Sequence, residues 1–196
     1  MKFYAVKNGR IPGIYTNWDA CKAQVIKYPG AEYKSFSTEK EANAYLAGNH
    51  SSEFTNELVK PYAFVDGSFN AETNVYGFGG FLIDDKGNEH ILQGHGDAVD
   101  MASMRNVAGE ILGAITAVKK AIELKLSKIT IYYDYKGIEC WVNGSWECKN
   151  PCTKMYREYM SKFNTKIDIN FIKVPAHTGI TGNERADRLA KEAVGL

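Results

Sequence analysis

The pattern of apolar and polar positions after residue 60 predicts three strands joined by short turns. Residues 62–66 (YAFVD) alternate so that Asp66 shares one side of the strand with two aromatic residues. We expect the Gly-Ser pair at 67–68 to end this strand. Apolar segments at 75–84 and 89–94 follow, and the four residues between them (DKGN) are typical of a hairpin turn. These segments predict an antiparallel meander.

The pattern then changes to alternating helices and strands. Apolar residues recur at the helical period over 103–124. The elements expected after this helix are a strand over 128–134, short helices over 135–141 and 153–163, a strand over 166–174 and a helix over 181–194. Strands that are separated by helices can lie parallel to one another. The order therefore predicts an α/β (α+β) fold with a five-stranded mixed sheet flanked by helices.

The first 47 residues predict a separate small module. Short strands are expected at 3–7, 13–16 and 32–36, with helices at 18–27 and 39–47. The next segment, rich in Gly, Asn, Ser and Thr, reads as a flexible linker. We therefore expect domains at 1–47 and 60–196 that are joined by a linker at 48–59.

Composition limits the class of protein. The 196 residues include 44% hydrophobic and 24% charged residues, which is ordinary for a globular protein with a core. No apolar run is long enough to span a membrane, and the start MKFYAVKNGR has no signal-peptide segment, so we expect a cytoplasmic protein. In that compartment the four cysteines are expected to be free thiols, and their spacing is a poor match to a zinc site.

Charge is spread unevenly along the chain. Residues 1–47 hold seven basic and four acidic residues, a net charge of +3, and the remainder holds 17 basic and 19 acidic residues, a net charge of −2. One interpretation is that the small module attracts a polyanion while the larger domain holds cations. The other is that both surfaces are ordinary and solvated.

Four acids of the larger domain lie in apolar surroundings. Asp66 and Asp134 stand at the expected ends of two strands, while Glu110 and Asp187 stand on expected helices. Each alone could be a surface or capping residue. If the fold brings them together, they repel and their pKa values rise, or they bind hard divalent cations through oxygen.

The small module contains two large aromatic residues, Trp18 and Tyr33. They are either core residues or a surface on which nucleic acid stacks. The polar residues beside them are Arg10, Asn17, Lys34 and Ser35.

The small module resembles the hybrid-binding domain found at the N-terminus of many type 1 ribonucleases H. The resemblance rests on the G-x-x-x-G-I-Y-x-x-W segment that ends at Trp18 and on the K-S-F segment at 34–36. It implies that Trp18 and Tyr33 pack on the deoxyribose face of the DNA strand. It also implies phosphate contacts from Arg10, Asn17, Lys34 and Ser35.

Residues 61–194 resemble the ribonuclease H catalytic domain. The motifs are F-V-D-G-S, an Asn four residues before a Glu, Y-Y-D, and V-P-A-H-T-G-I-T-G-N-E-R-A-D-R-L-A. The implied metal ligands are Asp66, Glu110, Asp134 and Asp187. His177, in a glycine-rich segment, is implied to assist proton transfer or product release. Gly67, Ser68 and Asn106 are implied contacts to the 2′-hydroxyl groups of RNA.

The resemblance also implies the reaction. A type 1 ribonuclease H hydrolyses the RNA strand of an RNA–DNA hybrid with two Mg²⁺ ions, for which Mn²⁺ can substitute, and leaves 3′-hydroxyl and 5′-phosphate ends. The chain is expected to act as a monomer on this duplex, to bind double-stranded RNA weakly, and to have no membrane partner.

One departure and two alternatives remain open. The segment 141–154 is short and only mildly basic where many single-domain members have a long protrusion rich in Lys and Trp. We therefore expect the small module to supply the missing affinity for hybrid. The alternatives are a DNA nuclease of the same superfamily, such as a transposase, integrase or Holliday-junction enzyme, and a binder of hybrids or double-stranded RNA with weak or no catalysis.

Overall fold

The structure, a computed structural model, describes residues 2–46, 58–175 and 181–196. The chain divides into two compact units, Met1–Asn56 and Glu57–Leu196. Most of the linker expected at 48–59 lies outside the described residues, so its flexibility stays a prediction.

The N-terminal unit is a three-stranded antiparallel sheet with two helices. The strands are β1 (Phe3–Asn8), β2 (Gly13–Tyr15) and β3 (Glu32–Phe36), in the order β2-β1-β3, and the helices are α1 (Trp18–Val25) and α2 (Glu39–Leu46). Its small core consists of Val6, Cys21 and Val25. The Thr38 hydroxyl and the Glu41 carboxylate pair with each other's backbone N–H groups, which forms the capping box that starts α2.

The C-terminal unit is built on a five-stranded mixed sheet of order β6-β5-β4-β7-β8. Its strands are β4 (Tyr62–Asn70), β5 (Val75–Ile83), β6 (Glu89–Gly96), β7 (Lys128–Tyr133) and β8 (Asp168–Lys173). Its helices are α3 (Val99–Ala102), α4 (Asn106–Glu123), α5 (Gly137–Asn143), α6 (Pro151–Phe163) and α7 (Thr181–Glu192). The first three strands are antiparallel, and β4, β7 and β8 are parallel, which confirms the predicted fold class.

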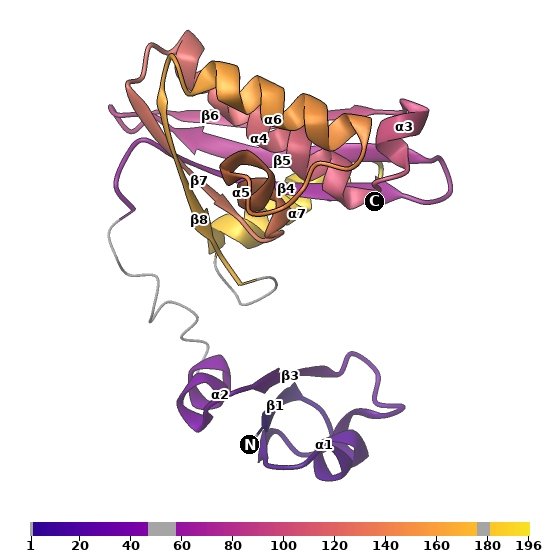
Figure 1. Cartoon of the computed structure of the whole chain (residues 1–196). Helices are drawn as coiled ribbons and strands as arrows, with labels where there is room; N and C mark the ends of the chain where they lie inside the picture. Colours follow the sequence, from indigo (N-terminus) through magenta and orange to yellow (C-terminus); the bar gives the residue numbers. More distant parts are fainter. Residues whose placement is uncertain (1, 47–57, 176–180) are drawn as a thin grey trace. The chain divides into compact units, whose positions relative to one another are not determined.

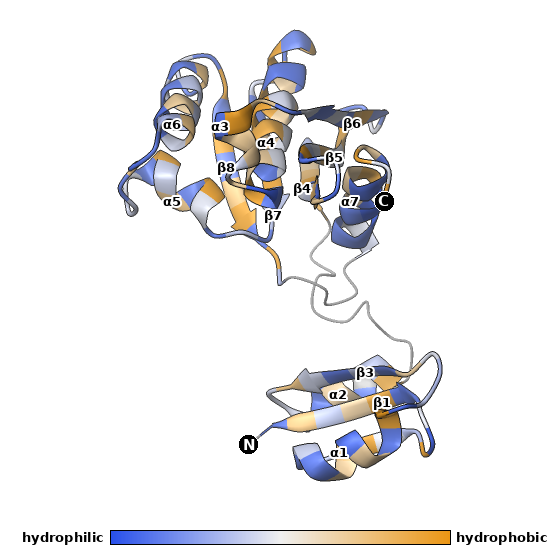
Figure 2. Cartoon of the chain, turned by 90° about the vertical axis from the view of Figure 1, so that its right-hand side faces the viewer, coloured by the Kyte–Doolittle hydropathy of each residue, from blue (hydrophilic) through white to orange (hydrophobic). Residues whose placement is uncertain are grey.

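Helices cover both faces of this sheet. Figure 1 shows α4 and α6 on one face and α7 on the other. The larger core lies under α4 and includes Ala63, Val65 and Ile131, while Phe64 and Tyr132 point to the α7 face. Alternate residues of each strand therefore supply the two cores. In Figure 2, α7 is coloured mostly hydrophilic, so the part of it that meets the sheet is narrow.

Two glycines of β5 let α7 approach the sheet closely. A Cβ atom added to Gly79 would lie 2.0 Å from the backbone nitrogen of Ala190, and one added to Gly77 would lie 2.5 Å from a methyl carbon of Val194. A side chain at Gly79 would therefore push the helix outward, and one at Gly77 would press on the turn that follows the helix.

The first strand extends beyond its predicted end. β4 does not stop at Gly67 but continues to Asn70, because β5 pairs with it over its whole length. The first pair is Tyr62 with Ile83, and the last is Asn70 with Val75. The turn begins at Asn70, whose side-chain oxygen accepts the backbone N–H groups of Glu72 and Thr73.

The long helix predicted over 103–124 begins three residues later than expected. A short helix, α3, precedes it, and α4 starts only at Asn106. The break is at Arg105, whose φ of 54° and ψ of −130° are incompatible with a helix. Periodicity alone did not reveal this break.

No described helix is long and apolar enough to cross a membrane. All four cysteines are free.

Candidate active site

Three carboxylates meet where the parallel pair β4 and β7 separates. The paired register of these strands ends at Phe64 and Tyr132, and Asp66 and Asp134 lie two residues further on. Glu110, in the second turn of α4, reaches the same place from the opposite face. One oxygen from each of the three acids lies within 4.8 Å of the others. The structure therefore brings together three of the four predicted ligands.

Two of these acids are buried. Asp66 is 7% exposed and Glu110 is 1% exposed. Burial, followed by the negative charge of Asp134, raises the pKa of Asp66 to about 7. The same causes, joined by the charge of Asp66, raise the pKa of Glu110 well above its ordinary value. The backbone N–H of Tyr135 donates to the Glu110 carboxylate at 3.3 Å and only partly offsets this cost.

The donor set fits a hard divalent cation. Carboxylate oxygens are the ligands that Mg²⁺ and Mn²⁺ prefer, and a cation would relieve the repulsion among the acids. Within the described residues, these three acids are also the only cluster of His, Cys, Asp or Glu side chains with this spacing. Their assignment as ligands stays a prediction.

Asp187 occupies a different place. It lies in α7 and lines the same cavity as Asp66 and Asp134, but it is not in the group of three oxygens. Its carboxylate accepts a hydrogen bond from the Lys191 ammonium at 2.6 Å, one helical turn later. Its negative charge contributes to the raised pKa of Asp66, which shows that the two carboxylates are close enough to interact.

Asp66, Asp134 and Asp187 line a cavity of about 440 Å³. Gly67, Ser68 and Asn106, the predicted contacts to RNA, also line it. A Cβ atom on Gly67 would lie 2.0 Å from the carbonyl oxygen of Asn106 and 2.5 Å from the backbone nitrogen of Glu110. Gly67 therefore lets α4 come close enough to deliver Glu110.

Two cationic residues of the cavity wall, Arg105 and Lys191, were not predicted from the sequence. Lys191 follows Asp187 by four residues, so the two share one face of a helix, and this spacing could have revealed it. Arg105 had no such signal, because its position depends on its unusual backbone conformation. His177 lies outside the described residues.

The N-terminal unit exposes the two predicted aromatic residues. Trp18 is 40% exposed and Tyr33 is 45% exposed, and their ring centroids are 5.9 Å apart. Tyr4 also packs against Trp18, with the ring centroids 5.6 Å apart. The rings therefore form a surface and are not core residues, which is the arrangement that stacking on nucleic acid requires.

The polar neighbours of these rings have structural partners. The Arg10 guanidinium donates to the carbonyl oxygens of Ala23 and Ile26 at the end of α1, and Asn17 caps the start of α1 by accepting the N–H of Ala20. The Lys34 ammonium lies 6.0 Å from the Phe36 ring centroid, and Ser35 is exposed. Their phosphate contacts stay predictions.

A mixed five-stranded sheet that presents buried carboxylates where two parallel strands separate is consistent with the ribonuclease H fold that the sequence motifs indicate. Comparison with known proteins agrees. Residues 60–195 match the family model described as RNase H, and residues 2–46 match the one described as Ribonuclease H1 N-terminal domain. The chain belongs to the RNase H family.

Individual relatives support both matches. Ribonuclease H1 of Homo sapiens is 26% identical over 97% of this chain and 88% of its own length. Ribonuclease H of Crithidia fasciculata is 53% identical over 24% of this chain and 10% of its own length. The crystal structure of RNase H1 from Halobacterium salinarum NRC-1 superposes with a TM-score of 0.55 at 26% identity, covering 69% of this chain and 97% of the other. The chain is thus a ribonuclease H enzyme with an N-terminal unit of the ribonuclease H1 type.

Proposed function

We propose that this protein hydrolyses the RNA strand of RNA–DNA hybrids at the carboxylate cavity of its C-terminal unit. The observation that carries the proposal is the convergence of Asp66, Glu110 and Asp134 within 4.8 Å. Two of these side chains are buried with raised pKa values, which is the expected state of ligands without their cations. Membership of the RNase H family supplies the substrate class.

Asp66, Glu110, Asp134 and Asp187 would hold the metal. The chemistry supplied by two bound Mg²⁺ ions, or by Mn²⁺ in their place, would be activation of the attacking water and stabilisation of the leaving 3′-oxygen, which gives 3′-hydroxyl and 5′-phosphate ends. Asp66, whose pKa is raised by the charges of both Asp134 and Asp187, would be the central ligand of the set. His177 would assist proton transfer or product release.

The wall of the cavity would select RNA. Ser68 and Asn106 and the backbone at Gly67 lie beside the carboxylates, where they can contact the 2′-hydroxyl groups of the strand to be cut. A DNA strand lacks these groups, so it would be held less well in the same position.

The N-terminal unit would hold the duplex. Trp18 and Tyr33 offer two exposed rings to the sugars of the DNA strand, and Lys34 and Ser35 lie beside Tyr33 on β3 for contacts to phosphate. The duplex can engage both units at once, which raises the effective concentration of substrate at the cavity. We infer that this unit supplies the affinity for hybrid that a basic protrusion supplies in other members. We also infer that the chain acts as a monomer. Its free cysteines suit the reducing cytosol.

The test is a cleavage assay with an end-labelled RNA–DNA hybrid in Mg²⁺, compared with double-stranded DNA and double-stranded RNA of the same sequence. We expect cleavage of the hybrid alone, with weak binding of double-stranded RNA. Asp134→Asn is the matched control, because it removes one charge and keeps the shape of the side chain. Absence of hybrid cleavage by the wild type in both Mg²⁺ and Mn²⁺ would refute the proposal.

A further inference from the structure

A row of stacked side chains crosses the sheet under α7. Tyr132, Phe64 and Phe81 are paired in register on β7, β4 and β5. The Tyr132 and Phe64 ring centroids are 4.7 Å apart, and those of Phe64 and Phe81 are 5.6 Å apart, with nearly parallel planes. The Arg185 guanidinium of α7 continues the row, 4.6 Å from the Phe81 ring centroid.

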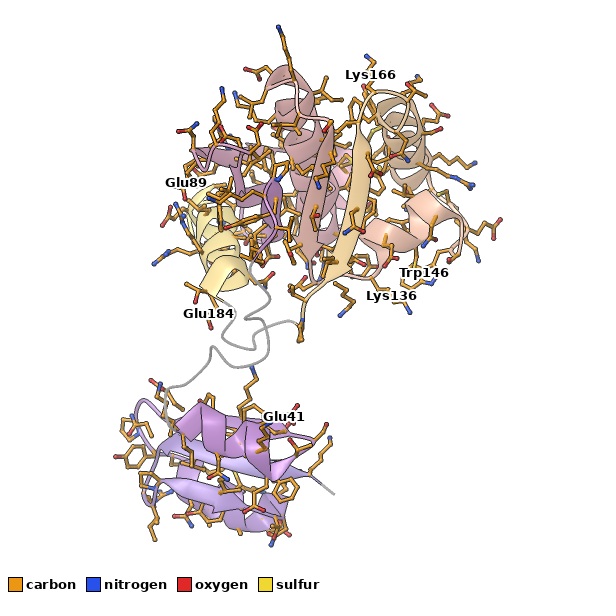
Figure 3. All side chains as sticks on the ribbon, turned by 90° about the vertical axis from the view of Figure 1, so that its left-hand side faces the viewer. Glu41, Glu89, Lys136, Trp146, Lys166 and Glu184 are labelled. Atoms are coloured by element: carbon orange, nitrogen blue, oxygen red, sulfur yellow. The ribbon has the colours of Figure 1, made fainter. Side chains whose placement is uncertain are left out.

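Arg185 is also tied to the edge strand. Its two terminal nitrogens donate to the two carboxylate oxygens of Glu89, the first residue of β6. This bidentate hydrogen bond lowers the pKa of Glu89. Figure 3 shows Glu89 beside α7, at the edge of the sheet. Arg185 thus fastens α7 to β5 by stacking and to β6 by an ion pair.

The row lies one layer behind the acids. Asp66 and Asp134 stand two residues beyond Phe64 and Tyr132, on the same side of their strands. α7 runs from the aromatic row toward the acids. Arg185 lies over Phe81 of the row, and Ala190 lies against Gly79, which pairs with Asp66. Asp187 therefore stands between two points at which α7 touches the sheet.

Asp187 depends on its helix for its position. Its one hydrogen-bond partner in the described part of the chain is Lys191, which belongs to the same helix. The later part of α7 is held by the glycines of β5 and by a hydrogen bond of 2.8 Å from the Gln93 side chain to the Leu189 carbonyl. Before Asp187, Gly182 and Ala186 pack on the apolar face of the sheet, and within the described residues the polar contact of this part of α7 with the sheet is that of Arg185 with Glu89.

We propose that Arg185 is a positioning residue for Asp187. By fixing the first turns of α7 against Phe81 and Glu89, it sets where the Asp187 carboxylate stands relative to the three clustered acids. The inference rests on the proposed role of Asp187 as the fourth metal ligand. Arg185 itself is not among the residues that line the cavity.

The test is Mn²⁺ binding to the metal-free full-length protein, measured by calorimetry, for the wild type and Arg185→Lys. Lysine keeps the charge but loses the planar fork and the stacking on Phe81. Groups bonded directly to a ligand change metal affinity by 10–100-fold, so for a group that acts through the helix we expect a loss of about three- to tenfold. The Mg²⁺ concentration for half-maximal cleavage should rise in parallel, with the KM for hybrid unchanged.

Two comparisons separate positioning from simple stabilisation. Arg188→Lys makes the same chemical change at an exposed position of the same helix and should leave Mn²⁺ affinity unchanged. In an Asp187→Asn background, Arg185→Lys should cause no further loss of affinity. Should Arg185→Lys fail to fold, Glu89→Gln weakens the same contact and should give a loss of the same kind.

Three outcomes would overturn the inference. The first is a wild-type affinity in Arg185→Lys or Glu89→Gln, and the second is an equal loss with and without the Asp187 carboxylate. Either would leave the proposed function intact. The third is the absence of Mn²⁺ binding by the wild type, which would overturn the proposed function and this inference with it.

Discussion

Replacing Asp66 by Asn should stabilise the metal-free protein while abolishing cleavage. Asn has nearly the same shape, and its side-chain oxygen can still accept the N–H of Gly67, which lies 2.7 Å from the Asp66 oxygen. The substitution therefore removes a charge and leaves the packing in place. A residue whose role was structural would lose stability instead.

The pKa of Asp66 gives the size of this effect. Burial first, and then Asp134, raise that pKa from 3.8 to about 7. At 1.36 kcal/mol per pKa unit, this difference is worth roughly 4 kcal/mol, as an upper bound. The folded protein retains a proton that the unfolded chain has already released, so stability falls as pH rises from about 4 to about 7. The cost is complete above pH 7 and absent below pH 4.

The assay is thermal unfolding in EDTA at pH 5 and pH 8 for the wild type and Asp66→Asn. At pH 8 we expect the variant to melt up to about 16 °C higher, since 1 kcal/mol shifts Tm by about 2–4 °C in a domain of this size. At pH 5 the gap should be smaller. Mg²⁺ should raise the Tm of the wild type more than that of the variant, because the cation offsets the charge that the variant lacks.

The reasoning would be wrong if Asp66→Asn melted below the wild type at pH 8, or if the gap did not grow with pH. Either result would mean that the carboxylate is already compensated within the protein. Asp66 would then be a structural residue, and the metal site would need another explanation.

Three further predictions follow from single positions. Gly67→Ala should lower the free energy of unfolding by about 1–3 kcal/mol, measured by urea denaturation, because a Cβ atom would lie 2.0 Å from the Asn106 carbonyl oxygen; a fully stable variant would contradict the close packing of α4. Arg105→Gly should raise the Tm, because its φ of 54° costs about 1–3 kcal/mol for a residue with a side chain; an unchanged or lower Tm would show that this conformation is not strained. Trp18→Ala should weaken hybrid binding by about 1–3 kcal/mol in a fluorescence titration with little change in stability, since the ring is 40% exposed; unchanged affinity would remove the aromatic surface from the binding site.

The fold could be predicted from the sequence where one face of an element is buried. The helical period of α4 and the buried-type apolar run of β7 each follow from burial in the larger core, and both elements lie close to where they were expected. The break at Arg105 and the extension of β4 past Gly67 could not be predicted. The extension depends on pairing with β5, the next strand, and the break depends on the backbone conformation of Arg105, neither of which the apolar pattern shows.

The site was predictable to the extent that it rests on strand register. Asp66 and Asp134 converge because β4 and β7 are parallel neighbours, and a helix between them delivers Glu110. Asp187 lies outside the group of three close carboxylates and bonds to Lys191. Its place depends on how α7 packs on the sheet, which the local sequence pattern does not show. The hydrogen bonds from Arg10 to the end of α1 could not be predicted either, because their acceptors are backbone carbonyl groups, which every residue has.

The close contact of α7 with β5 has a consequence for how this sequence can change. Gly77 and Gly79 carry no chemistry and lie outside the set of cavity-lining residues, yet a side chain at Gly79 would displace the helix that bears Asp187, and one at Gly77 would displace the turn at the end of that helix. A saturation mutagenesis screen for activity should therefore find these two positions nearly as intolerant as the carboxylates. At these two positions, intolerance to substitution would reflect the short distance between the sheet and the C-terminal helix, and not a role in catalysis.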